Sequence, residues 1–111
     1  MGMRHPTFLL SHKRVYGCGT CHSHLSTEEC IVSRQFNGQH GKAYLFDQVV
    51  NVYFGDAEDR HMTTGMHTVR DIRCRKCAAV LGWKYDRAFV QTEKYKEGKF
   101  ILEKNIMVDV Q

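Results

Sequence analysis

Four of the five cysteines form two C-x-x-C pairs, Cys18–Cys21 and Cys74–Cys77. Each pair can present two thiolates to one ion from a tight turn, and two pairs supply the four sulfur ligands of a tetrahedral structural zinc site. Thiolates select zinc or an iron–sulfur cluster over magnesium or calcium. Two disulfides, or four unrelated buried cysteines, are the alternatives. Four protein ligands leave no open position for water, so we expect one structural, non-catalytic Zn²⁺.

A spacer of 52 residues separates the two pairs. The ion would therefore join two remote hairpins instead of nucleating a single finger. Binding of structural zinc supplies on the order of 10–16 kcal/mol in small peptides. This exceeds the usual stability of a domain of 111 residues, so we expect the metal-free chain to be unfolded or molten. Arg73, Arg75 and Lys76 are expected to offset the net charge of −2 on a zinc held by four thiolates.

An aromatic pair follows the second cysteine pair. Trp83 and Tyr85 share one face if they lie on a strand. Such a face can bind a flat ring or a cation, or it can pack in the core. A loop before Gly41 can close over it, although a polar turn is the simpler interpretation. The candidate ligand- or partner-binding residues are Trp83, Tyr85, His67, Asn37 and Gln39, with Tyr44 or Phe46 as further candidates.

Charge and composition limit the classes of partner. Lys plus Arg is 16 and Asp plus Glu is 12, a net charge of +4 that is dispersed along the chain. Nucleic-acid-binding proteins usually concentrate such charge, so the dispersal argues against that class. The longest clean apolar run, residues 77–81, is far shorter than a membrane span needs. The five cysteines without a visible signal peptide favour a reducing compartment.

A thiol enzyme is the catalytic alternative. A chain related to methionine sulfoxide reductase would need a nucleophilic cysteine near its C-terminus, and residues 100–110 contain none. Cys30 is the one cysteine outside the two pairs, and we expect it to be a buried small apolar residue. The sequence therefore predicts that the protein is not an enzyme.

The elements that must position these residues are mostly β. The chain holds twelve aromatic residues, one proline and nine glycines, which suits short strands separated by turns. Residues 1–13 are predicted to form an N-terminal arm in which Phe8-Leu9-Leu10 docks on the body, and residues 14–111 to form one domain. The predicted strands are residues 31–36, 43–54 (one long strand or a hairpin), 67–73, 79–85 and 100–110, with a helical turn or two within 88–96.

The spaced residues resemble those of the Yippee family. Beyond the two cysteine pairs, the matching positions are Gly41, Leu45, Asn51, Gly65, Gly82-Trp83-Lys84-Tyr85, Lys96 and Glu103. The resemblance covers residues 15–110, nearly the whole chain, and only the N-terminal arm lies outside it.

The resemblance implies a β-tent fold, in which two antiparallel sheets meet at an angle and are pinned by one four-cysteine zinc site. Similar folds occur in the thalidomide-binding domain of cereblon, a centromere-licensing family, methionine sulfoxide reductase B and the RNA-sensing domain of RIG-I-like helicases. Trp83 and Tyr85 match part of cereblon's imide-binding aromatic cage. The resemblance further implies a binding or adaptor module of the nucleus and cytoplasm, linked to cell division. Its expected partners are proteins, among them subunits of the CTLH/GID ubiquitin ligase, with an imide-like small ligand or RNA as alternatives.

Overall fold

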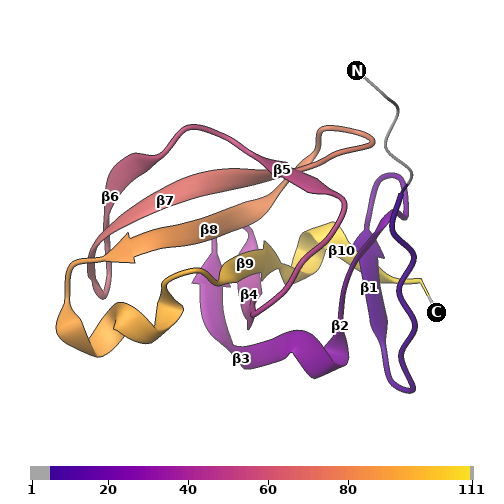
Figure 1. Cartoon of the computed structure of the whole chain (residues 1–111), viewed down its shortest axis with the longest axis horizontal. Helices are drawn as coiled ribbons and strands as arrows, with labels where there is room; N and C mark the ends of the chain where they lie inside the picture. The colour runs from indigo at the N-terminus through magenta and orange to yellow at the C-terminus, as the bar shows by residue number, and fades with distance from the viewer. Residues whose placement is uncertain (1–5, 111) are drawn as a thin grey trace.

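The computed structural model describes residues 6–110, which form two antiparallel β-sheets (Figure 1). The smaller sheet has the order β10-β1-β2, from strands Met107–Asp109, Val15–Cys18 and His24–Thr27. The larger sheet has the order β3-β4-β9-β8-β7-β5, from strands Ile31–Gly38, Gly41–Phe46, Phe100–Glu103, Val80–Ala88, Gly65–Cys74 and Val52–Phe54; β6 (Glu58–Met62) also pairs with β7. Three 3₁₀ turns, η1 (Glu28–Cys30), η2 (Gln91–Lys96) and η3 (Lys104–Ile106), connect strands.

The larger sheet is buried on both faces along β4. In β4, four consecutive residues from Ala43 to Phe46 are buried. Tyr44 and Phe46 face the smaller sheet with Tyr16, whereas Ala43 and Leu45 pack on the opposite face with other apolar side chains. A strand covered on both faces needs a continuous apolar run instead of an alternating one. This is why residues 43–46 carry no period-two pattern.

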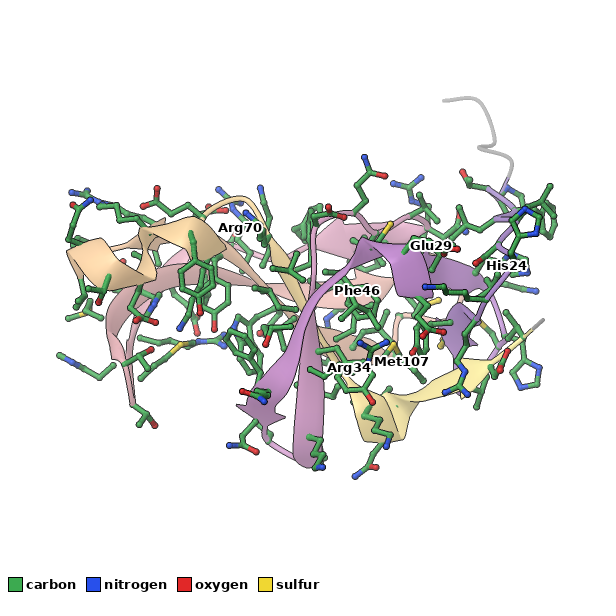
Figure 2. The ribbon with its side chains drawn as sticks, turned by 90° about the horizontal axis from the view of Figure 1, so that it is seen from below. His24, Glu29, Arg34, Phe46, Arg70 and Met107 are labelled. Carbon is green, nitrogen blue, oxygen red and sulfur yellow. The ribbon has the colours of Figure 1, made fainter. Side chains whose placement is uncertain are left out.

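The cluster between the sheets connects them by packing. Tyr16 meets Phe46 edge-on with ring centroids 5.6 Å apart, and Met107 from β10 packs against the same cluster. Figure 2 shows Phe46 at the centre of the molecule, close to Met107. The cysteine pairs lie at the rim of this cluster, where Cys18 and Cys74 are fully buried. The mostly β fold with two sheets is confirmed.

The close packing of β8 on β9 depends on Gly82. A Cβ atom built on Gly82 would lie 1.9 Å from the carbonyl oxygen of Ile101, which is inside any normal contact distance. Gly82 pairs with Leu102 in the register of the two strands. The glycine therefore allows β9 to approach the strand that carries Trp83 and Tyr85.

Two predicted elements were wrong in detail. Residues 43–54 form neither one long strand nor a hairpin: β4 ends at Phe46, and β5 pairs with β7 on the far side of β9 and β8. The chain crosses between them through Asn51, which has a left-handed φ of 60°. Residues 100–110 likewise do not form one strand. They divide into β9 of the larger sheet, the turn η3, and β10 of the smaller sheet. The short helical segment predicted within 88–96 is the 3₁₀ turn η2.

The described part of the arm, residues 6–13, docks mainly through its backbone. Thr7 exchanges two hydrogen bonds of 2.8 Å with the side-chain amide of Asn51, and the Leu9 amide donates to His24 Nδ1 at 2.9 Å. Phe8 meets the His24 ring edge-on but is 75% exposed, and Leu10 is 96% exposed. The expected docking by apolar side chains was therefore wrong for Leu10. Met1–His5 lie outside the described residues, and the domain boundary at residue 14 stays a prediction.

Across residues 6–110, no helix is long and apolar enough to cross a membrane.

Candidate metal centre and aromatic pocket

The four paired cysteines converge on one point. Their Sγ atoms all lie within 4.8 Å of one another, and the Cys18–Cys77 and Cys21–Cys74 sulfur pairs are each 3.5 Å apart. A zinc ion bound to four sulfurs at about 2.3 Å requires sulfur–sulfur distances of about 3.8 Å. The cluster therefore has the donor set and the spacing of a closed, structural zinc site, and one structural zinc is confirmed as the expected cofactor.

The two cysteine turns have the same backbone conformation. The amide of His22 donates to the Cys18 carbonyl at 2.8 Å, and the amide of Ala78 donates to the Cys74 carbonyl at 2.8 Å. His22 and Ala78 are equivalent positions, and each has a left-handed φ of 64°. The β1–β2 turn comes from the smaller sheet and the β7–β8 turn from the larger one, and they lie side by side in Figure 1. A bound ion therefore fastens one sheet to the other.

The sulfurs differ in their affinity for protons. Burial opposes ionisation of Cys21, but hydrogen bonds from Ser23 and the neighbouring thiols lower its pKa to about 6. Burial, followed by the surrounding sulfurs, raises the pKa of Cys77 to about 12. Four sulfurs at this spacing ionise together only when a cation neutralises their negative charge. A zinc ion supplies that positive charge.

Two of the three predicted basic neighbours are anchored beside the cluster. Arg73 donates to the Ala78 carbonyl at 3.0 Å, and Arg75 donates to the Val52 carbonyl at 3.1 Å. The backbone of the second cysteine turn and of β5 therefore anchors these two side chains. Within residues 6–110, the group that can hold a metal consists of cysteines alone, so His22 and His24 are not part of it.

A pocket of about 700 Å³ lies further along the β7–β8 hairpin. It is formed by β3, β6, the β6–β7 turn, β8 and η2. Four of the five candidate partner-binding residues, Trp83, Tyr85, Asn37 and Gln39, line it. His67 lies behind Tyr85, with ring centroids 5.1 Å apart, and is fully buried. The tertiary structure thus brings the candidate residues together, while their role in binding stays a prediction.

Trp83 and Tyr85 share a face, as their spacing predicts, and contact each other edge-on at 6.3 Å. Tyr85 is 2% exposed and belongs to the core, while Trp83 is only partly buried. Burial raises the pKa of Tyr85. Trp83 Nε1 and His67 Nε2 have no hydrogen-bond partner among the residues that the structure describes. Tyr85 is therefore a core residue, and both Tyr85 and Trp83 form part of the pocket wall.

Two expectations about individual side chains need correction. Tyr44 and Phe46 do not line the pocket, because they point to the opposite face of the larger sheet. Cys30 is only partly buried: it packs against the cluster between the sheets and accepts a hydrogen bond from Thr27 Oγ1 at 3.4 Å. Arg70, which is labelled in Figure 2, pairs across the strands with Asp86 at 2.6 Å.

The sequence marked Lys96 only as a family-matching position, and the structure places it in the pocket wall. Lys96 is 3% exposed, and its Nζ atom contacts Glu93 Oε1 at 2.6 Å and Thr64 Oγ1 at 3.0 Å. The same atom lies 5.1 Å from the ring centroid of Phe36 and 5.4 Å from that of Tyr85. These partners come from four different elements or turns, so no local sequence pattern could have identified the arrangement.

Comparisons with known proteins agree with this geometry. Residues 14–111 match a family model described as Yippee zinc-binding/DNA-binding /Mis18, centromere assembly. Human protein yippee-like 3 is 50% identical over 97 residues, which cover 87% of this chain and 81% of that protein. Mouse protein yippee-like 4 is 50% identical over 95 residues, covering 86% and 75%. The crystal structure of the Mis18 "Yippee-like" domain matches with a TM-score of 0.67 at 15% identity, covering 87% of this chain and 94% of that one, which shows a shared fold.

Proposed function

The chain belongs to the Yippee-Mis18 family, and on that premise we propose that it is a zinc-stabilised binding module that recognises a protein segment through the pocket beside Trp83. The observation that carries the proposal is the pocket itself. Its wall holds a partly exposed tryptophan, and the amide side chains of Asn37 and Gln39 line the same cavity. Aromatic residues beside polar groups are characteristic of binding sites for flat or amphipathic groups.

A binding role agrees with the chemistry of the thiols. Four cysteines close the metal centre, which leaves no coordination position for a reacting water. The remaining thiol, Cys30, packs against the cluster between the sheets and is not among the residues that line the pocket. The similar proteins reported above carry no enzyme name. Together these features support a module without catalytic activity of its own.

We place this module in a regulatory complex of the nucleus and cytoplasm, with CTLH/GID-type ubiquitin ligase subunits as the first partners to test. The family resemblance supports this assignment, and the description of the family as one of centromere assembly supports a role in cell division. A small imide-like ligand is the alternative occupant of the pocket, because Trp83 and Tyr85 match part of the aromatic cage of cereblon. It ranks second because the match to that cage is incomplete.

Nucleic acid is the second candidate partner, because the matched family is also described as DNA-binding. Ion pairs between arginine and acidic side chains argue against nucleic-acid binding. Arg34 pairs with Glu28 at 3.1 Å, and Arg60 pairs with Asp71 at 2.9 Å. Pairing of this kind neutralises part of the positive charge that a phosphate backbone would need. Salt-dependent retention of DNA or RNA by the purified chain would favour this second function.

The test is affinity purification with quantitative mass spectrometry, comparing the wild type with Trp83→Ala. Tyr53→Ala is the matched control, because Tyr53 is an exposed aromatic residue on β5 outside the pocket. Both variants must keep one zinc per chain and the wild-type circular dichroism spectrum. We expect Trp83→Ala to lose specific partners that Tyr53→Ala keeps. An unchanged set of partners in folded Trp83→Ala would remove the pocket from the proposal.

A further inference from the structure

The pocket contains a cation that belongs to the chain itself. Lys96 ends the 3₁₀ turn η2 and is almost completely buried, whereas lysine side chains are almost always exposed. Its ammonium lies among three aromatic rings, 5.1 Å from Phe36, 5.4 Å from Tyr85 and 6.0 Å from Tyr95, measured to the ring centroids. Rings at these distances attract a cation through their electron-rich faces.

The buried charge is also paired and hydrogen-bonded. Glu93, one turn earlier in η2, lies 2.6 Å from Lys96 Nζ, and hydrogen bonding to Lys96 lowers the pKa of its carboxyl group. Thr64, from the β6–β7 turn, accepts a hydrogen bond from the same ammonium at 3.0 Å. Ring faces, a carboxylate and a hydroxyl are together the parts of a receptor for alkylammonium groups. Lys96 supplies the ammonium to this receptor.

We propose that Lys96 is the built-in occupant of this aromatic cage, that it excludes ammonium ligands such as methylated lysine, and that the pocket takes an uncharged or acidic flat group. The inference rests on the proposed function and names the chemical class that the pocket recognises. Without Lys96, the pocket's aromatic walls would favour a cation.

The charges around the pocket agree with this preference. Among the described residues that line it, Glu93 is the only carboxylate, and Lys96 neutralises it. Arg60, the second cation of the lining, is shared between Glu58 and Asp71. An incoming cation would therefore find no unpaired carboxylate among these lining residues, and its place between the rings is taken by Lys96. An uncharged or acidic group does not need such a carboxylate and can use the amides of Asn37 and Gln39.

The first experiment removes the internal cation from the full-length, zinc-loaded chain. Tetramethylammonium is titrated against the wild type, Lys96→Ala and the matched control Lys94→Ala, and binding is followed through the indole N–H signal of Trp83. Lys94 is in the same turn but does not line the pocket. We expect Lys96→Ala to bind the probe with an affinity about tenfold or more above that of the wild type. Lys94→Ala should bind it no better than the wild type does. Glu93→Gln added to Lys96→Ala should reduce that gain.

A folded Lys96→Ala that binds tetramethylammonium no better than the wild type would overturn the inference.

The second experiment uses the wild type alone, so it stands if Lys96→Ala does not fold. Benzyl alcohol, benzoate and benzyltrimethylammonium share a flat ring and differ in charge. We expect the Trp83 signal to respond to the alcohol or to benzoate and not to the ammonium. A response to the ammonium equal to the others, or no response to any probe, would overturn the inference.

These results are separable from the proposed function. Loss of partners in Trp83→Ala, combined with a wild-type pocket that accepts ammonium, would keep the binding module and reject the ligand class. Unchanged partners in Trp83→Ala, combined with the expected charge preference, would keep the ligand class and reject the pocket as the protein-binding surface.

Discussion

At the scale of single residues, the cysteines carry the strongest chemistry. Each of the four sulfurs supplies a ligand that no neighbouring side chain within residues 6–110 is placed to replace. Cys18 and Cys74 are fully buried, so a lost sulfur also leaves an unfilled position inside the protein. Cys30 differs from all four because it contacts the cluster between the sheets and does not belong to the candidate metal group.

Cys74→Ser should abolish zinc binding at a stoichiometry of one and with it the cooperative unfolding transition. Loss of one ligand removes much of the binding free energy, which is on the order of 10–16 kcal/mol for structural zinc in small peptides. Native mass spectrometry and thermal denaturation measure the two effects. Cys30→Ser is the control and should keep its zinc, with a loss of about 1 kcal/mol. A Cys74→Ser protein that retains zinc and melts like the wild type would contradict the assignment.

Zinc affinity should fall as the pH falls. Zinc binds thiolates, so protons compete with it at each sulfur. The pKa of Cys77 is raised to about 12, which means that zinc must displace a tightly held proton there, and the apparent affinity rises with pH. The pKa of Cys21 is lowered to about 6, so its thiolate gains a proton below that pH. A chromogenic chelator should report faster and more complete zinc release at pH 5 than at pH 7.5; release independent of pH would argue against thiolate ligation.

At the scale of elements, the β7–β8 hairpin connects the metal centre to the pocket. Its turn carries Cys74 and Cys77, and Trp83 and Tyr85 follow on β8. β9 holds β8 from the other side, through the close approach of Ile101 to Gly82. The position of Trp83 in the pocket wall therefore depends on the packing of one glycine next to it.

Gly82→Ala should destabilise the protein by about 1–3 kcal/mol or more, because the new methyl group collides with a backbone carbonyl that cannot rotate away. The built Cβ atom lies 1.9 Å from the Ile101 oxygen. Chemical denaturation measures the loss. Gly55→Ala is the matched control, because its Cβ atom would meet Asp71 at an ordinary 3.9 Å. Equal stabilities of the two variants would show that β8 and β9 separate more easily than the structure indicates.

At the scale of the whole molecule, the metal centre and the pocket occupy opposite ends of the larger sheet. The cysteine turns lie at one end in Figure 1, and the β6–β7 turn and η2, which line the pocket, lie at the other. Two sheets meet through one apolar cluster and one group of four sulfurs. A small core of this kind leaves little stability once the ion is removed.

Removal of zinc by a strong chelator should therefore unfold the pocket as well as the metal centre. We expect loss of the β-sheet circular dichroism signal and a red shift of the fluorescence of Trp83, the only tryptophan in the chain. Added zinc should restore both signals. Native-like spectra after verified removal of the metal would show that the apolar cluster alone holds the two sheets together.

The sequence by itself determined the features whose cause is local. The spacing within each C-x-x-C pair identified all four metal-ligating candidates, and the period of two placed Trp83 and Tyr85 on one face. Only the tertiary structure decided which face of β4 each residue occupies, because both faces of this strand are buried and Tyr44 and Leu45 both suit a buried position. It also decided the environment of Lys96, whose ammonium gathers partners from separate elements. Such long-range contacts exist only after the strands have paired, so no short stretch of sequence can encode them.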